Sequence, residues 1–131
     1  MKYLTLLKAR ENQAEAGAPP AELFEALGKL GAEATAAGVL VDTGGIGPSA
    51  LGAKVTLAGG EVTVTDGPFT EAKELVASYA LYDVSSKEEV VEWTRRFLDA
   101  HNELWKGWEA SAEILQVFGP EDFAAPGGPQ G

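Results

Sequence analysis

The chain has no cysteine, a single histidine and few basic residues, and each shortage excludes a class of function. Without cysteine it can form neither a disulfide nor a thiolate metal site, and with His101 alone it cannot form a multi-histidine metal site. Acidic residues outnumber Lys and Arg by 20 to 10, which gives a net charge of −10. Nucleic acids and anionic membrane surfaces both require clustered positive charge, so we expect neither as a partner. We also expect no metal and no cofactor.

Long hydrophobic runs are absent as well. No run approaches the length of a transmembrane helix, and the segment Met1–Lys8 is too short and too polar at its ends for a signal peptide. We therefore expect a cytoplasmic protein. The 131 residues, of which 45% are hydrophobic, suffice for one folded domain, predicted over residues 1–123. The Ala-, Pro- and Gly-rich residues 124–131 offer little apolar surface and are predicted to form a flexible tail.

Hydrophobic periodicity and turn residues predict six strands and two helices. Gly44 and Gly45 are expected to break the second strand, and Ala58-Gly59-Gly60 to join a hairpin. Ser85 and Ser86 each precede a glutamate by three residues, a capping box that predicts the start of the second helix. The expected strands are 2–9, 39–41, 54–57, 61–65, 75–84 and 112–118, and the expected helices are 20–37 and 85–101.

The first helix contains two glycines, Gly28 and Gly31, each of which costs about 1 kcal/mol relative to alanine. This helix must therefore depend on tertiary packing. In the first strand, both alternating sets of side chains include apolar residues, which predicts a central position in the sheet.

The order of elements predicts the α+β class, with a ferredoxin-like antiparallel sheet, two helices on one face and an extra β-hairpin. The other face of such a sheet must be covered, and no third helix is available to cover it. We therefore expect a symmetric homodimer.

The segment Val62–Glu74, which contains Asp66-Gly67-Pro68-Phe69, resembles the signature of the DGPF branch of the YCII-related family. The opening Met1-Lys2-Tyr3, the Gly38-Val39-Leu40 turn and the capped helix with Glu92-Trp93 agree with it, so that the resemblance covers roughly residues 1–118. It implies a dimeric α+β barrel. Many members have no known activity, some relatives with this barrel act on aromatic ring-cleavage products, and some DGPF members are linked to extracytoplasmic-function sigma factors.

One branch of the family has a proposed catalytic histidine in the first helix, paired with an aspartate. Residues 20–37 contain no histidine, so that pair cannot be carried over. Other candidates remain. His101 could act as an acid or base if a carboxylate orients it, or it could be a solvated residue at the end of a helix. Asp42 could be a pocket carboxylate, or simply a turn residue.

The signature segment supplies the candidate ligand-binding residues. In one interpretation it lies at the mouth of a pocket, where Asp66 and Lys73 make polar contacts and Phe69 lies beside them. In the other it is a turn, with Asp66 as its cap and Phe69 in the core, although a turn does not explain Lys73. Tyr79 is a further candidate. Its odd separation from Tyr82 places the two rings on opposite faces of a strand, one toward the pocket between sheets and the other toward the helices.

The sequence thus predicts a homodimer that binds a small organic molecule in a pocket between sheet and helices. The alternatives are a cofactor-free lyase or isomerase that uses a carboxylate or His101, and a regulatory partner of a sigma factor. A carboxylate or histidine inside a closed pocket would favour catalysis, and an apolar pocket without one would favour binding.

Overall fold

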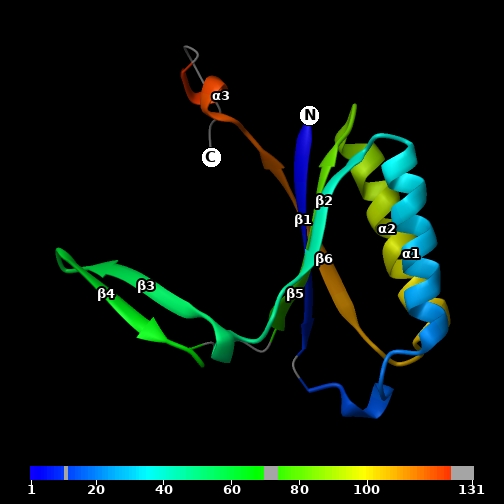
Figure 1. Ribbon diagram of the computed structural model, residues 1–131, viewed down its shortest axis with the longest axis horizontal. Helices are drawn as coiled ribbons and strands as arrows, with labels where there is room; N and C mark the ends of the chain where they lie inside the picture. Colours follow the sequence, from blue (N-terminus) through cyan, green and yellow to red (C-terminus); the bar gives the residue numbers. More distant parts are fainter. Residues whose placement is uncertain (11, 70–73, 125–131) are drawn as a thin grey trace.

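The computed structural model describes residues 1–10, 12–69 and 74–124 (Figure 1). Two short 3-10 turns, Ala14–Ala16 and Ser49–Leu51, lie between the main elements. The strands are β1 (Lys2–Arg10), β2 (Leu40–Gly45), β3 (Ala53–Ala58), β4 (Glu61–Asp66), β5 (Glu74–Asp83) and β6 (Ala110–Val117), and the helices are α1 (Ala21–Ala36), α2 (Lys87–Leu104) and α3 (Pro120–Ala124).

Four of the strands form one antiparallel sheet in the order β2-β5-β1-β6. Helices α1 and α2 both lie on the same face of this sheet (Figure 1). This is the ferredoxin-like α+β arrangement predicted from the order of elements, with β3 and β4 as a separate hairpin. Strand β1 lies between β5 and β6, which confirms its central position.

The two faces of the sheet differ in their surroundings. Tyr3, Thr5 and Leu7 of β1 are buried toward the helices, whereas Leu4 and Leu6 point to the opposite, partly exposed face. The buried core under the helices is made of Tyr3, Ala34, Val39, Tyr82, Val84 and Val90. No helix among the described residues covers the second face, which we call the open face (Figure 1).

The ends of both long helices follow from local chemistry. Pro20 is the residue before α1, where its missing N–H is not needed, and Gly38 follows the helix at φ 75°, in the left-handed region. At the start of α2, the Ser86 hydroxyl accepts a hydrogen bond from the Glu89 N–H at 3.2 Å, while the Glu89 carboxylate accepts one from the Ser85 N–H at 3.0 Å. The predicted capping box is therefore confirmed.

The prediction that Gly44 and Gly45 break the second strand is wrong. Strand β2 continues through both glycines and pairs them with Tyr79 and Ser78 of β5. The physical reason is steric, because a Cβ added at Gly44 would lie 2.8 Å from the Cε1 atom of Tyr79. The glycine leaves room for an aromatic ring across the strand, and so it is a packing requirement instead of a turn signal.

The hairpin β3–β4 turns at Gly59 and Gly60, which both have positive φ, as a two-residue hairpin turn requires. It projects away from the four-stranded sheet on the side opposite α1 and α2 (Figure 1). The short helix α3 was not predicted, and it extends to Ala124, one residue past the expected domain boundary. The rest of the predicted tail lies outside the described residues. No helix in the described ranges combines the length and the apolar character needed to cross a bilayer.

Candidate functional site

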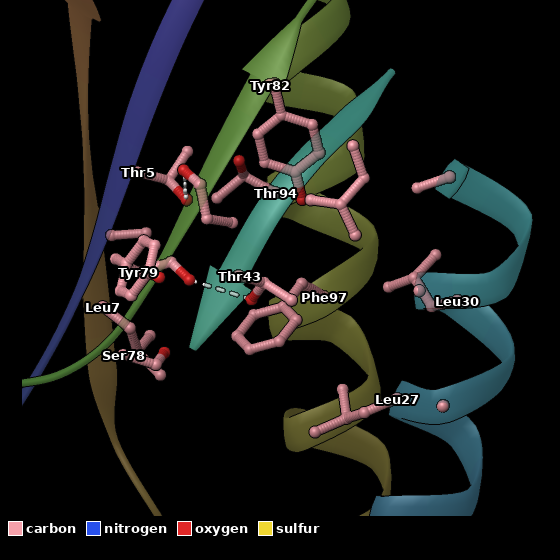
Figure 2. A pocket seen from close by; sticks show the side chains of 16 residues that line it. Thr5, Leu7, Leu27, Leu30, Thr43, Ser78, Tyr79, Tyr82, Thr94 and Phe97 are labelled. Carbon is pink, nitrogen blue, oxygen red and sulfur yellow. Dashed lines mark hydrogen bonds between the residues drawn. The ribbon is translucent and has the colours of Figure 1, made fainter. Parts of the chain in front are cut away.

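A cavity of about 300 Å³ lies between the sheet and the two helices. Strands β1, β2, β5 and β6 form one wall, and α1 and α2 form the other (Figure 2). The rings of Tyr82 and Phe97 project into this space from the two walls. The apolar part of the lining is formed by Leu7, Leu27, Leu30, Ala34, Leu40, Ala80, Phe97 and Ala112.

Six lining residues carry hydroxyl groups. The Tyr79 hydroxyl is bound to Asp42, and three others bind backbone carbonyls. They are Thr5, bonded to the Ala80 carbonyl at 3.3 Å, Thr43, bonded to the Tyr79 carbonyl at 2.9 Å, and Thr94, bonded to the Val90 carbonyl at 2.8 Å. The remaining two, Ser78 and Tyr82, have no hydrogen-bond partner among the described residues.

No fully buried side-chain polar atom in the described residues lacks a partner, so the Ser78 and Tyr82 hydroxyls are not fully buried, and both residues line the cavity. Burial raises the pKa of Tyr82 above its ordinary value, which keeps its phenol protonated. The cavity therefore offers two free hydroxyl groups in an otherwise apolar lining. None of the described lining residues is a carboxylate, histidine, lysine or arginine.

Gly28 and Gly31 of α1 also line the cavity. A Cβ added at either position would have no heavy atom within 4 Å, so the absence of side chains here leaves open space. Gly28 is exposed as well, which places it at the opening of the cavity. The two helix-weakening glycines noted in the sequence thus lie in the cavity wall, at positions where a side chain would meet open space.

Two predicted site residues, Asp42 and Tyr79, meet on the open face of the sheet. The Tyr79 hydroxyl donates to Asp42 Oδ2 at 2.9 Å, and Asp42 Oδ1 accepts from the Thr43 N–H, also at 2.9 Å. The hydrogen bond to Asp42, followed by desolvation, raises the pKa of Tyr79. Both oxygens of this carboxylate are therefore engaged. Asp42 does not line the cavity, and although Tyr79 is among its lining residues, the Tyr79 hydroxyl is held by Asp42 on the open face. As predicted, Tyr79 and Tyr82 occupy opposite faces of β5.

His101 lies elsewhere, in the last turn of α2, and the interpretation of it as a solvated residue is wrong. Only 7% of its surface is exposed, because its ring stacks on Trp108 at 5.0 Å and contacts Phe97 at 4.7 Å. Its Nδ1 lies 2.8 Å from the Phe97 carbonyl, which can only accept, so Nδ1 carries the proton. Burial lowers its pKa more than this bond raises it. His101 is thus a neutral, packed side chain oriented by a carbonyl and by none of the described carboxylates.

Residues Asp66-Gly67-Pro68-Phe69 of the signature segment lie at the base of the hairpin. Gly67 donates its N–H to the Gly52 carbonyl at 2.9 Å, and a Cβ added there would lie 1.6 Å from the Ser49 carbonyl oxygen. Only glycine permits this approach of β4 to the turn at Ser49–Leu51. Asp66 is the exposed last residue of β4, and Lys73 lies outside the described residues.

Phe69 is half-buried and lines a second, more open hollow, together with Lys8, Arg10, Ile46 and Glu74. It lies neither in the buried core nor in the wall of the sheet–helix cavity. The structure thus groups the sequence candidates by position: Asp42 with Tyr79 on the open face, Asp66 and Phe69 at the hairpin base, and His101 in an aromatic cluster.

Of the residues that line the cavity, the sequence analysis singled out Tyr79 and Tyr82 and did not identify the others. The signal that could have found them is the alternation of Ser78, Ala80 and Tyr82 along one face of β5. A second signal is the spacing of Gly28 and Gly31, which stacks two missing side chains on one face of α1.

Comparisons with known proteins agree with the family resemblance of the signature segment. No curated protein matches the chain. The family model described as "YCII-related domain" matches residues 1–106, which include β1 to β5, both long helices and the Asp66-Gly67-Pro68-Phe69 motif. With most of its length matched, the chain belongs to the YCII-related family.

Proposed function

We propose that this protein binds a small, largely apolar and uncharged organic molecule in the cavity between its sheet and its helices, and that it does so as a homodimer. The observation that carries the proposal is the composition of the cavity, whose described lining is apolar apart from hydroxyl groups and contains no ionisable acid or base except the phenols of Tyr79 and Tyr82. A charged ligand would lose its hydration there without gaining a counter-charge. A neutral ligand with one polar group would keep a hydrogen bond to Ser78 or Tyr82.

The volume and the glycines support this proposal. Ligand cavities usually begin at about 300 Å³, and this one is about that size. Gly28 and Gly31 each weaken α1 by about 1 kcal/mol. A helix that only had to cover the sheet would be more stable with alanine at both positions. Retaining space at the expense of helix stability is what a binding cavity requires.

Catalysis by a lyase or isomerase would need a proton acceptor at the ligand. Asp42 lies on the opposite face of the sheet, where both its oxygens accept hydrogen bonds, and the Nδ1 of His101 is committed to a carbonyl. Neither side chain lines the cavity. This separation favours binding over catalysis at this site.

The homodimer is supported by the open face of the sheet. On β6, Leu115 is 51% exposed and Val117 37% exposed, while β1 contributes Leu4 and Leu6 to the same face. A four-stranded sheet with an uncovered, partly apolar face is stabilised when a second sheet packs on it.

The test compares two probes of the same shape, toluene and benzyl alcohol, which differ by one hydroxyl group. Binding is measured by chemical-shift changes of the cavity residues in wild type and in Tyr82→Phe. We expect both probes to bind wild type, and the variant to lose about fivefold to tenfold in affinity for benzyl alcohol alone, the value of one hydrogen bond. Tyr79→Phe is the matched control, because it removes the same atom from the opposite face of β5.

Failure of both probes to shift the cavity residues would refute binding of small apolar molecules at this site. Equal effects of the two variants would refute the role of the Tyr82 hydroxyl.

A further inference from the structure

One face of the hairpin β3–β4 carries four exposed aliphatic side chains, with Ala53 and Asp66 paired at its base. Its register places Val55 opposite Val64 and Leu57 opposite Val62, so all four side chains lie on the same side of the ribbon. These side chains are 66% to 75% exposed. The opposite side carries lysine, threonine and glutamate residues. We call the four aliphatic side chains the apolar face of the hairpin.

Nothing in the described part of the chain covers this face. Strands β3 and β4 pair only with each other, and the ribbon stands apart from the four-stranded sheet (Figure 1). An isolated two-stranded hairpin is marginally stable in water at best. Four exposed aliphatic side chains on such an element indicate that it packs against another surface.

The position of the hairpin points to what that surface is. The hairpin and α3 both project on the side of the sheet opposite α1 and α2, which is the side of the open face (Figure 1). Phe118 and Phe123, at α3, form an edge-on pair and are 40% and 66% exposed. Of the fourteen exposed large hydrophobic residues in the described ranges, eight lie on the hairpin, on β6 or at residues 118–123. The unpartnered apolar surface is therefore concentrated on one side of the molecule.

The area needed for a stable interface favours participation of the hairpin. Four strands of 6 to 10 residues give the open face an area of about 500 Å². Two such faces packed together would bury about 1,000 Å², which is less than the roughly 1,200–2,000 Å² that specific interfaces bury. Each six-residue ribbon adds roughly 200 Å² of its own surface and covers a similar area of its partner. Sheet faces and hairpins together reach the ordinary size.

We propose that the apolar face of the hairpin packs against a second copy of this chain, so that each copy extends one arm over its partner. The inference rests on the homodimer proposed above and adds the segment that holds it together. Two-fold symmetry makes the contact twice, once for each hairpin. With a net charge of −10, two copies repel each other, so the contact must be stabilised by apolar burial. The four aliphatic side chains carry no charge, and Asp66 is the one charged residue on their side of the ribbon, at its base.

The test uses two adjacent residues that point to opposite faces of β4. Val64→Lys places a charge on the apolar face, whereas Thr63→Lys makes the same change in charge, and the same loss of a β-branched residue, on the polar face. Dimer dissociation constants are measured by sedimentation equilibrium, and amide exchange of residues 53–66 is measured above and below the dissociation constant. We expect Val64→Lys to raise the dissociation constant at least about tenfold and Thr63→Lys to change it less than about threefold. Hairpin amides should exchange more slowly in the dimer.

Other outcomes overturn distinct parts of the inference. A wild-type monomer at high micromolar concentration would overturn both the homodimer and the role of the hairpin. A wild-type dimer equally affected by both substitutions, or one whose hairpin amides exchange as fast as in the monomer, would overturn the hairpin contact alone. Sedimentation of wild type, but not of Val64→Lys, with phosphatidylcholine vesicles would assign the apolar face to a lipid surface instead. Circular dichroism checks that the four-stranded sheet is intact in both variants.

Discussion

Replacing Gly28 and Gly31 by alanine should make the protein more stable and a poorer binder at the same time. Glycine inside a helix costs about 0.5–1 kcal/mol relative to alanine, so the double variant should gain about 1–2 kcal/mol. Neither new methyl group meets a heavy atom within 4 Å, so no clash offsets the gain. For a chain of 131 residues, 1 kcal/mol corresponds to about 3–4 °C in Tm, and the expected rise is about 3–8 °C.

The same two methyl groups take up space in a cavity of about 300 Å³ and at its opening. A ligand that fits the wild-type cavity must then shift or strain its surroundings, which typically costs about 1–3 kcal/mol, or roughly fivefold to a hundredfold in affinity. Toluene serves as the probe, since it needs no hydrogen bond. The matched control is Thr35→Ala, an exposed position of α1 that does not line the cavity. It should gain a few tenths of a kcal/mol and bind toluene as wild type does.

Two results would refute this reasoning. A lower melting temperature of the double variant would show that the helix wall has no room for the methyl groups. A higher melting temperature with unchanged toluene binding would show that the space beside the two glycines is not where the ligand lies.

Three further predictions follow from residues outside the cavity. The folded state lowers the pKa of His101, so unfolding takes up a proton and the free energy of unfolding should fall as the pH drops below about 6.5. Urea melts from about pH 7.5 to 5.5 should therefore show a smaller loss of stability in His101→Phe than in wild type. Gly67→Ala must displace the Ser49 carbonyl and should speed amide exchange at the hairpin base, and unchanged exchange there would contradict the steric argument. Asp42→Asn should lower the pKa of Tyr79 in an ultraviolet titration, because the raising carboxylate is gone, while stability changes by less than about 0.5 kcal/mol at this exposed pair.

The sequence contained enough information to predict the six strands, the two long helices and their arrangement, but not α3 or the full length of β2. The ends of the long helices could be predicted because capping depends on residues close in the chain, as at Ser86 with Glu89 and at Gly38. The hairpin turn was readable because Gly59 and Gly60 supply its two positive φ angles. In each case, the residues that determine the structure are neighbours in the chain.

The candidate site was harder to predict from the sequence, because its residues come together only in the folded sheet. From the sequence alone, Gly44 is expected to break the strand. Its role as space for an aromatic ring becomes clear only in the folded sheet, where the ring of Tyr79 lies across it. The pairing of Asp42 with Tyr79 depends on the β2–β5 register, which shifts between Leu40 and Asp42. His101 was expected at a solvated helix end, and only the stacking of Trp108 from the following loop buries it.

Strand β5 contributes both to the cavity and to the open face of the sheet. Its residues Ser78, Ala80 and Tyr82 line the cavity, whereas Tyr79 and Leu81 alternate with them on the open face, and the Thr43–Tyr79 hydrogen bond ties the strand to its neighbour. A ligand that moves β5 therefore also moves the surface on which a second chain would pack. Such coupling is reciprocal: if binding tightens association, association must tighten binding by the same factor. We therefore expect the apparent affinity for a cavity ligand to depend on protein concentration over the range in which the dimer forms.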